Sequence, residues 1–348
     1  MPTWVNLAYD RSSVNIPPLS ILLPVRNEAD HLPHALASLR RQTFDDWELV
    51  AVDDGSTDAT PQILAAAADI DRRIRIINPV GRGLVPALNA GLSACRAPLV
   101  ARMDGDDIAH PRRLELQLAC LRSQPETGLV ACSFRHFPRT GLKVGMLAYE
   151  AWQNSLATHE AIMRDMFVES PFVHPSVMFR KEVVAAVGGY RDMGWAEDYD
   201  LWLRLAAAGV RFARLSRPLF FWRERPARAT RTMAEYTAAA FRACKAHHLR
   251  RSFLAGADEV MLAGAGKEGR AWRLALDREG VAVSRWVDVD PRKIGRQLHG
   301  VPVVAADAVT PSMGRLLVTV GTRGVREELR RWATASGFRE GEDFLCVT

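Results

Sequence analysis

Four short apolar runs alternate with stretches of helical periodicity in the first 110 residues. The runs are LSILLPV (19–25), WELVAVDD (47–54), RIRIINP (73–79) and APLVARMD (97–104). Apolar runs of this length are typical of strands that are covered on both faces, and the segments between them place apolar residues at helical spacing. Strands that alternate with helices favour a mostly parallel sheet with helices on both faces. The pattern therefore predicts an α/β fold.

Polar residues stand at or just after the end of each run. In open α/β sheets, ligands bind outside the carboxyl ends of the strands. We therefore expect these residues to surround a binding site: Asn27 and Glu28, Asp53 and Asp54, Asn78, and Asp104.

The pattern becomes irregular beyond residue 129 and starts again near residue 258. Residues 195–210 indicate an acidic loop that leads into an amphipathic helix, and residues 234–257 an Ala-rich helical connector. Residues 259–290 then repeat strand, glycine turn, helix and strand. A length of 348 residues also favours two domains. We expect a first domain at 17–235, a helical connector at 236–257 and a second α/β domain at 258–348.

Composition points to a folded protein without a membrane segment. Hydrophobic residues make up 48% of the chain and charged residues 25%, as in soluble globular domains. No apolar run approaches the roughly 20 residues that span a bilayer, and the first residues lack a signal-peptide pattern, so we expect a cytoplasmic location. The five cysteines are scattered and never in C-x-x-C spacing, which predicts neither a disulfide framework nor a zinc site.

An arginine cluster stands out in a chain whose net charge is +6. It contains one acid, Glu224. Such a cluster attracts phosphate or anionic lipid, although an ordinary solvated face is an equally good explanation. We expect no nucleic-acid partner, and we keep open a peripheral contact with the anionic inner face of a membrane. The arginines are Arg211, Arg214, Arg217, Arg223, Arg225, Arg228 and Arg231.

The segment DGDD packs Asp104, Asp106 and Asp107 into four positions after the fourth apolar run. Like charges this close repel one another, and a hard divalent cation with oxygen ligands would neutralise them. Mg²⁺ is usually held by one or two carboxylates together with substrate phosphates. A polar turn, in which Asp107 caps the next helix, is the alternative. An EF-hand is excluded because Ile108 stands where a ligand is needed.

Four sequence blocks occur together in a recognisable order. They are LPVRNEADHL with VDDGSTDAT, GRGLVPALNAGLSACRAPLVARMDGDD, HPSVMFRKEVVAAVGGYR, and WAEDYDLWLRL. Together they resemble the inverting glycosyltransferases of family 2, which have the GT-A fold. The resemblance covers about residues 20–225.

This resemblance implies a site for a nucleotide-diphosphate sugar, linked to UDP, GDP or dTDP. Asp53 and Asp54 would receive the base and the ribose, and the resemblance does not decide which does which. Arg82 would lie over the nucleotide or its diphosphate, and Asp104 near the ribose. The remaining residues of the nucleotide pocket would be Pro24, Arg26, Asn27 and Glu28.

The resemblance also implies a metal and a general base. Asp106 would bind Mn²⁺ or Mg²⁺ directly together with Asp104, and His174 would touch the metal, the diphosphate or the acceptor. Asp198 would be the base that deprotonates the acceptor hydroxyl, and Glu197 would bind the acceptor or raise the pKa of Asp198. Capping of the following helix is the structural alternative for these two acids.

The second domain carries Gly264, Gly266 and Gly269 in G-x-G-x-x-G spacing, and Asp288 ends the next predicted strand. Between a strand and a helix, this motif indicates a Rossmann-like nucleotide site. The segment is similar to the small domains that precede sugar-nucleotide acetyltransferases, which implies a nucleotide or nucleotide sugar as ligand. Close packing of the helix on the strand, with no ligand, is the alternative.

The sequence thus predicts a metal-dependent, inverting transfer of one sugar to a hydroxyl of a glycan or lipid-linked acceptor, as in cell-surface polysaccharide biosynthesis. Two alternatives remain. A sugar nucleotidyltransferase would need a Gly-rich loop after its first strand, and LPVRNEADHLP has no glycine. A regulatory protein that only binds nucleotide sugars has no need for a base at Asp198.

Overall fold

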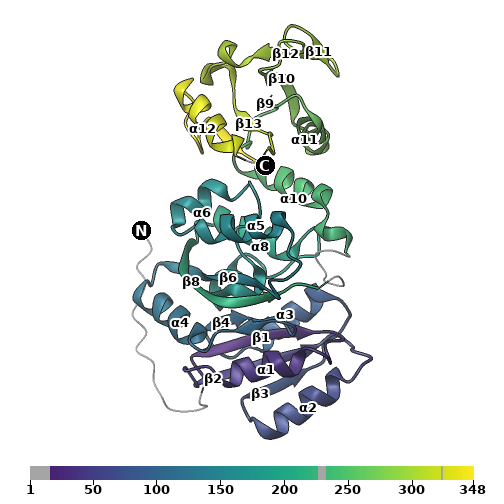
Figure 1. Ribbon diagram of the computed structural model, residues 1–348, viewed down its shortest axis with the longest axis vertical. Coiled ribbons are helices and arrows are strands. Elements are labelled where there is room, and N and C mark those ends of the chain that lie inside the picture. Colours follow the sequence, from purple (N-terminus) through teal and green to yellow (C-terminus); the bar gives the residue numbers. More distant parts are fainter. Residues whose placement is uncertain (1–15, 226–232, 323) are drawn as a thin grey trace.

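The computed structural model describes residues 16–225, 233–322 and 324–348, which form two α/β units joined by helix α10, Ala238–Arg251 (Figure 1). The first unit contains an eight-stranded sheet in the order β3-β2-β1-β4-β7-β6-β8-β5. The second contains a six-stranded sheet in the order β11-β12-β10-β9-β13-β14. The predicted fold class, a GT-A-like α/β unit followed by a small second α/β unit, is confirmed.

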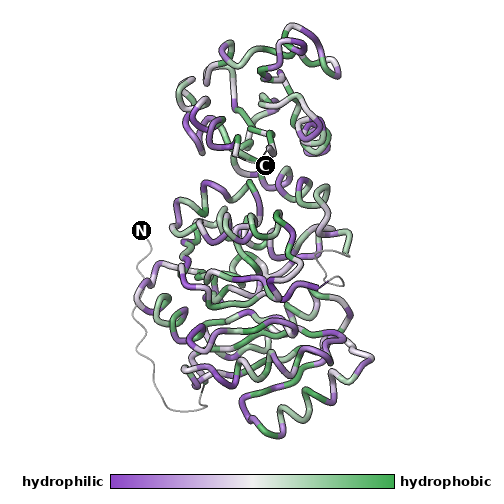
Figure 2. The backbone as a smooth tube through the Cα atoms, in the orientation of Figure 1, coloured by the Kyte–Doolittle hydropathy of each residue, from purple (hydrophilic) through white to green (hydrophobic). Residues whose placement is uncertain are grey.

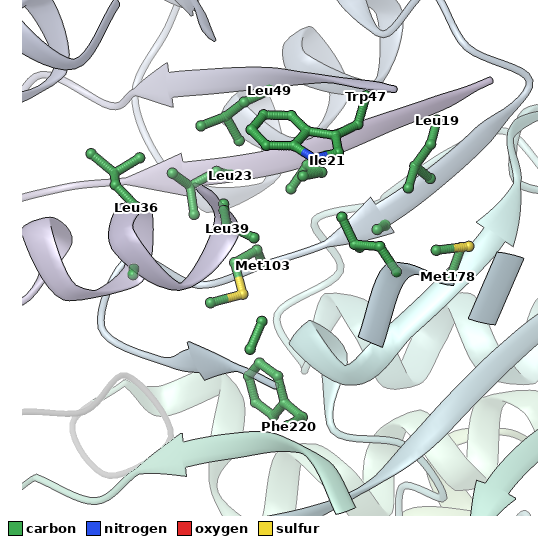
Figure 3. Packing of buried hydrophobic residues seen from close by; sticks show 14 of the residues in the cluster. Leu19, Ile21, Leu23, Leu36, Leu39, Trp47, Leu49, Met103, Met178 and Phe220 are labelled. Carbon is green, nitrogen blue, oxygen red and sulfur yellow. The ribbon is translucent and has the colours of Figure 1, made fainter. Parts of the chain in front are cut away.

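The four predicted strands form the parallel half of the first sheet. They are β1 (Leu19–Val25), β2 (Trp47–Asp53), β3 (Ile74–Ile77) and β4 (Leu99–Arg102). Every residue of β1 and β2 is buried, which explains why apolar residues predominate in both strands (Figure 2). Leu23 of β1 packs with Leu36 and Leu39 of α1 (Leu32–Arg40) on one face of the sheet (Figure 3).

The remaining elements of this unit complete a mixed sheet. Strand β7 is antiparallel to both β4 and β6, whereas β6 and β8 run parallel to each other. Helices α2 and α3 follow β2 and β3 as crossovers. The bounds are α2 (Thr60–Ile70), α3 (Leu84–Ala94), β5 (Ile108–Ala109), α4 (Arg113–Ser123), β6 (Thr127–Phe137), α5 (Val144–Ser155), α6 (His159–Asp165), β7 (Val177–Arg180), α7 (Lys181–Ala186), α8 (Glu197–Ala207) and β8 (Arg211–Arg223).

Strand β1 pairs with β4 only from Leu19 to Leu22. Their register ends at Leu22 and Arg102, whereas β1 continues beside β2 as far as Val25. Pro24 has no N–H to donate, so it cannot extend the ladder toward β4. The two strands therefore separate at their carboxyl ends, at the place where the strand order reverses and where ligands bind in open α/β sheets.

The second unit has the strand order of a doubly wound sheet. In chain order its parallel strands are β9 (Glu259–Ala263), β10 (Ala282–Asp288), β12 (Val301–Ala305), β13 (Leu316–Val318) and β14 (Phe344–Cys346), arranged 3-2-1-4-5. Helices α11 (Lys267–Arg278) and α12 (Val325–Ala335) belong to this unit, and the short β11 (Gln297–Leu298) pairs antiparallel with β12. We retain 236–257 as the proposed connector between the two domains.

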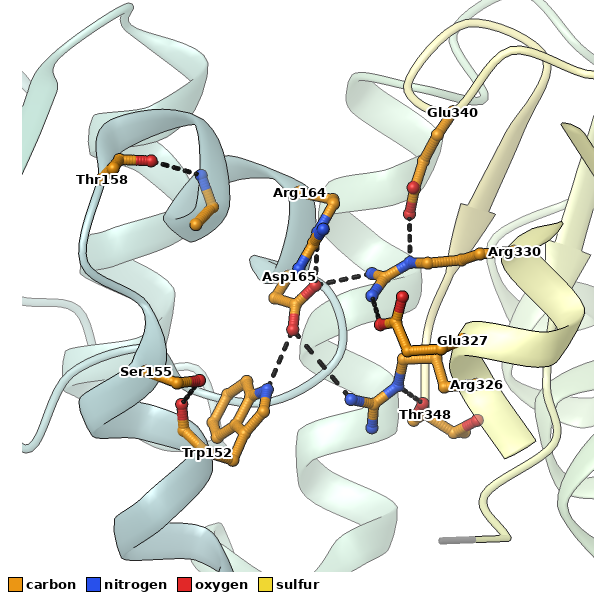
Figure 4. A network of polar contacts seen from close by, with 11 residues as sticks. Trp152, Ser155, Thr158, Arg164, Asp165, Arg326, Glu327, Arg330, Glu340 and Thr348 are labelled. Carbon is orange, nitrogen blue, oxygen red and sulfur yellow. Dashed lines mark hydrogen bonds and ion pairs between the residues drawn. The ribbon is translucent and has the colours of Figure 1, made fainter. Parts of the chain in front are cut away.

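A buried ion network joins the two units (Figure 4). Asp165 at the end of α6 contacts Arg330 of α12 at 2.6 Å, and both side chains are less than a tenth exposed. Arg330 also contacts Glu340 and Glu327, and Trp152 of α5 donates its indole N–H to Asp165. Removal of one partner from such a pair leaves a buried charge uncompensated, so the network ties the units firmly together.

Two further observations concern the chain as a whole. Val168 of the first unit packs within the apolar core of the second, beside Met261 and Phe344. None of the helices in the described ranges combines the length and apolar character that a membrane crossing requires.

Glycine spacing in the second unit has a packing explanation. A Cβ placed on Gly269 would lie 1.9 Å from the Gly264 carbonyl oxygen, so α11 can approach the loop after β9 only because residue 269 has no side chain. Gly264 itself has φ +108, a conformation that favours glycine. A Cβ on Gly266 would meet nothing within 4 Å.

We expect Gly269→Ala to destabilise the second unit by about 1–3 kcal/mol, because the new methyl group forces α11 away from the loop. The measurement is urea unfolding of the full chain, followed by the fluorescence of its tryptophans. Gly266→Ala is the matched control, since it adds the same methyl group in open space and changes only a helix N-cap. Equal stability of the two variants would contradict the packing explanation.

Candidate functional site

A cavity of about 650 Å³ opens where β1 and β4 separate. One part of its wall comes from the ends of β1, β2 and β4 and includes Arg26, Glu28, Asp54, Asp104 and Asp106. The rest of the wall comes from the second half of the unit and from the segment before α10. It includes Tyr149, Glu169, His174, Glu197, Asp198, Trp222 and Tyr236.

The structure separates the two acids at the end of β2. Asp54 lines the cavity, accepts a hydrogen bond from the Gly83 N–H at 2.8 Å and lies 3.6 Å from the Arg26 guanidinium. The Asp53 carboxylate instead accepts from the N–H and the hydroxyl of Ser56 and closes the turn after the strand. Asp54 is therefore the acid of this pair that faces the cavity.

Other residues from the first two blocks divide in the same way. Pro24 and Arg26 line the cavity. Asn27 adopts φ 54 and accepts from the Thr57 N–H at 2.8 Å, so it shapes the loop instead of lining the cavity wall. Arg82 is exposed beside Gly55, at the rim.

The three aspartates after β4 gather as predicted from their spacing. One oxygen from each of Asp104, Asp106 and Asp107 lies within 4.8 Å of the others. Arg102, which is 3% exposed, contacts Asp104, and Arg225 donates from Nε to Asp106 at 2.9 Å. Two guanidinium groups thus offset part of the negative charge of the cluster.

Glu28 belongs to the same acidic group. It contacts Arg225, yet burial and the nearby Asp106 carboxylate raise the pKa of Glu28 to about 7. Its Oε2 is buried and has no hydrogen-bond partner among the described residues. One carboxylate oxygen of this acidic group is therefore buried without a hydrogen bond to any described residue.

A second acidic pair also lines the cavity. The sequence predicted an acidic loop before a helix, but α8 begins at Glu197, so Glu197 and Asp198 occupy its first turn, where the helix dipole favours negative charge. Glu197 accepts from the Tyr236 hydroxyl at 2.8 Å and lies 3.4 Å from Nδ1 of His174. Although burial opposes its ionisation, these contacts lower the pKa of Glu197.

Asp198 has the opposite electrostatic environment. Its Oδ1 accepts from the Tyr199 N–H at 2.7 Å, and the residue is partly exposed to the cavity. Burial and the adjacent Glu197 charge hold the pKa of Asp198 well above that of an ordinary aspartate. Two neighbouring carboxyl groups with pKa values moved apart are typical of acid–base sites.

His174 lies with this pair and not with the three aspartates. It begins a 3₁₀ turn, His174–Ser176. Its Nδ1 faces Glu197 and its Nε2 lies 2.9 Å from the Tyr190 hydroxyl. A neutral ring that donates to Glu197 and accepts from Tyr190 satisfies both contacts, and burial lowers the pKa of His174, which favours that neutral form.

Comparison with known proteins assigns this arrangement to a family. Residues 20–188 match the model of glycosyl transferase family 2. The chain is 31% identical over 213 residues to the putative glycosyltransferase EpsE of Bacillus subtilis, covering 60% of this chain and 73% of that protein. This chain belongs to glycosyltransferase family 2. It is also 33% identical over 199 residues to the amylovoran biosynthesis glycosyltransferase AmsE of Erwinia amylovora, covering 56% and 72% of the two chains.

Solved structures agree on the fold of the glycosyltransferase. The crystal structure of S. aureus TarS 1–349 superposes with a TM-score of 0.53 at 16% identity, covering 75% of this chain and 70% of that one. The complex of the same protein with UDP-GlcNAc has a TM-score of 0.50 at 17% identity, covering 75% and 80%.

Sequence reasoning missed several residues of the glycosyltransferase cavity. Arg102 stands two positions before Asp104, within the predicted fourth strand, so nothing in the sequence placed it at the cavity. Tyr236 lies in the predicted connector, far from any motif. Tyr149 and Glu169 come from a region without periodicity. In each case long-range packing, and no local pattern, brings the side chain to the cavity.

The arginine cluster does not form a single exposed face among the described residues, and a membrane contact through Arg211 to Arg231 stays a prediction. Arg214 is buried and donates to the carbonyls of Leu156 and Pro171. Arg223 donates to the Asp106 carbonyl at 2.6 Å, and Arg225 binds Asp106 and Glu28. Arg211 and Arg217 are exposed, while Arg228 and Arg231 lie outside the described residues.

The predicted second nucleotide site has competing internal contacts. Asp288 accepts from the Ala265 N–H at 3.0 Å and from Lys293 at 2.9 Å. The carboxylate expected to bind a ribose is therefore bonded to the glycine loop itself. Nucleotide binding at Gly264, Gly266, Gly269 and Asp288 stays a prediction.

Proposed function

We propose that this family 2 glycosyltransferase moves one sugar, with inversion, from a nucleotide-diphosphate sugar to a hydroxyl of a glycan or lipid-linked acceptor, in cell-surface polysaccharide biosynthesis. One observation carries the proposal. A single cavity is lined by Asp54, by Asp104 and Asp106 of the three-aspartate cluster, and by the Glu197–Asp198 pair. The relatives support this role, since AmsE is named for amylovoran biosynthesis and WbnJ of Escherichia coli, 28% identical, for O-antigen biosynthesis.

The acidic cluster fits a divalent cation. Its donors are carboxylate oxygens close enough to share one ion, and the Glu28 Oε2 beside them lacks a partner among the described residues. We propose that Asp106 and Asp104 hold Mn²⁺ or Mg²⁺ there. When bound, the cation offsets negative charge on the departing nucleoside diphosphate. We leave His174 out of this set because both its ring nitrogens face other partners.

In this proposal, one set of cavity residues binds the nucleotide and another takes the proton from the acceptor. Asp54 accepts hydrogen bonds from the base or ribose, and Arg26 at its side meets the nucleotide. Asp198 takes the proton from the acceptor hydroxyl, and Glu197 keeps the pKa of Asp198 high enough for proton transfer. His174 and Tyr236 hold Glu197 in place. A raised pKa suits a base that works near neutral pH.

Two substitutions separate donor binding from transfer. We expect Asp106→Ala to weaken donor binding in the presence of Mn²⁺ by about tenfold or more, because a metal ligand is lost. We expect Asp198→Asn to bind the donor normally and to lose about 10²- to 10⁴-fold in kcat, because the base is lost. Calorimetry with UDP-, GDP- and dTDP-sugars, with Mn²⁺ and with chelator, measures the first effect. If both variants bind the donor equally well with Mn²⁺ and with chelator, the proposed roles of Asp106 and Asp198 are wrong.

The pH profile of kcat tests the carboxyl pair. Asp198 acts only when deprotonated, so activity falls as the pH drops through its raised pKa. Removal of the Glu197 charge lowers that pKa, and we therefore expect Glu197→Gln to move the acidic limb down by about 1 pH unit or more. Glu160→Gln, a change at an exposed acid of α6, is the control and should leave the limb in place. An unmoved limb in Glu197→Gln rules out Asp198 as the titrating base.

The pair at the end of β2 offers a matched test of the nucleotide pocket. We expect Asp54→Asn to weaken nucleotide binding by about 1.5–3 kcal/mol, because a carboxylate acceptor in the cavity is lost. Asp53→Asn should weaken it less, since Asp53 bonds Ser56 and does not line the cavity. The dissociation constants of UDP, GDP and dTDP for the two variants decide the point, and a larger effect at Asp53 reverses the assignment.

A further inference from the structure

The catalytic cavity meets a second cavity that lies between the two units. This second cavity has a volume of about 680 Å³, within the range of small-molecule sites. Three residues, Tyr149, Glu169 and Phe241, line both cavities. Phe241 stacks on Tyr199, the residue that follows Asp198 in α8, so the shared boundary includes the part of the catalytic cavity that carries the Glu197–Asp198 pair.

Both units and the connector contribute to this interdomain cleft. Helix α5 provides Tyr149 and Trp152, and α10 provides Ala238, Phe241 and Arg242. From the second unit come Glu268 at the start of α11, Gly321 after β13 and Val347 after β14. The carboxyl edge of the second sheet thus faces the cleft, as the carboxyl edge of the first sheet faces the catalytic cavity.

The walls of the cleft are held in fixed positions. Lys245 of α10, which is 6% exposed, donates to the Val168 carbonyl of the first unit at 2.6 Å and to the Val347 carbonyl of the second at 3.2 Å. Arg242 pairs with Glu268 at 2.8 Å across α10 and α11. With the Asp165–Arg330 contact, these bonds fix both sides, so the cleft is formed before any ligand arrives (Figure 4).

The lining of the cleft combines aromatic faces with charged hydrogen-bonding groups. The rings of Tyr149 and Trp152 lie 5.8 Å apart at an interplanar angle of 38°. Glu169, half-buried on the shared wall, and Glu268 supply carboxylate acceptors, and Arg242 supplies donors. A sugar ring has one face of C–H groups and a rim of hydroxyls, which matches apolar ring surfaces beside carboxylates and a guanidinium.

We propose that the interdomain cleft is an extended acceptor subsite, which holds the sugar units of an oligosaccharide acceptor beyond the unit that is glycosylated. This inference rests on the proposed function, because it requires a glycan acceptor whose reacting hydroxyl reaches Asp198. The terminal sugar lies in the catalytic cavity beside Glu197 and Asp198. The preceding units pass Tyr149 and Glu169 and lie between α5, α10 and the second unit.

A role for the second unit follows directly. It forms one wall of the acceptor site, so the enzyme distinguishes a growing glycan from a single sugar by contacts outside the catalytic domain. The same arrangement favours one addition per acceptor, since the cleft holds the sugars that precede the reacting one and a lengthened chain must shift to react again.

Two neighbouring alanines at the start of α10 provide a matched test. Ala238 and Ala239 are both exposed, but only Ala238 lines the cleft. Ala238→Trp places an indole in the cleft, whereas Ala239→Trp adds the same side chain elsewhere on the helix. Equal melting temperatures show that both variants fold. The probe is an array of bacterial surface glycans of one to six sugar units, read with the full chain in the presence of UDP, GDP or dTDP and Mn²⁺.

We expect the wild type and Ala239→Trp to bind glycans of three or more units at least tenfold more tightly than single sugars. Ala238→Trp should lose this preference for length. A wild type that binds no glycan, or binds all lengths equally, overturns the proposal, and so does an Ala238→Trp variant that keeps the preference. Release of nucleoside diphosphate by the wild type from each nucleotide sugar in the presence of the glycans is measured separately. No release with any nucleotide sugar refutes the proposed transfer itself, whereas release without a length preference refutes only the cleft.

Discussion

The constraint on which the site depends is the concentration of negative charge at the point where β1 and β4 separate. Asp104, Asp106 and Asp107 come within 4.8 Å of one another, and Glu28 lies against the same turn. Such a cluster is stable only if positive charge is supplied. The chain supplies part of it through Arg102 from β4 and Arg225 from the end of β8, and a cation with a diphosphate fits the remainder. The long strand β8 is thus tied to β1 by electrostatics as well as by the sheet.

The second acidic pair extends this dependence into the connector. Glu197 is held by His174 from the first unit and by Tyr236 from the segment before α10. Further along α8, Asp200 pairs with Arg204 at 2.7 Å and with His248 of α10 at 2.9 Å. This bonding occupies both Asp200 oxygens, so Asp200 links α8 to α10. Helix α10 therefore fixes the base side of the cavity and the second unit together.

The features that depend on local sequence pattern were predictable, and those that depend on tertiary packing were not. The parallel strands and the acids at their ends follow from apolar runs and from the edge to which parallel strands deliver their last residues, whereas the GT-A fold was implied by the resemblance of four sequence blocks to a family. The division between Asp53 and Asp54 was not predictable, because it depends on which carboxylate Ser56 captures. Arg102, Tyr149, Glu169 and Tyr236 were missed because each reaches the cavity through tertiary packing. The arginine cluster was not predictable as a unit. Its described members have three different environments: a buried site where a guanidinium binds carbonyls, the acidic cluster at the cavity, and the surface.

The two units show that strand order alone does not make a binding site. Both begin with a 3-2-1-4 arrangement, and in both a loop follows the first strand at the point of reversal. In the first unit, Pro24 ends the ladder and the strands open into a cavity. In the second, Gly269 lets α11 press against the Gly264 carbonyl, and Asp288 takes the Ala265 N–H, so the glycine loop is bonded internally. The open space at the carboxyl edge of the second sheet lies instead beside β13 and β14, against the first unit. This is the side on which we propose that the preceding sugars of the acceptor lie.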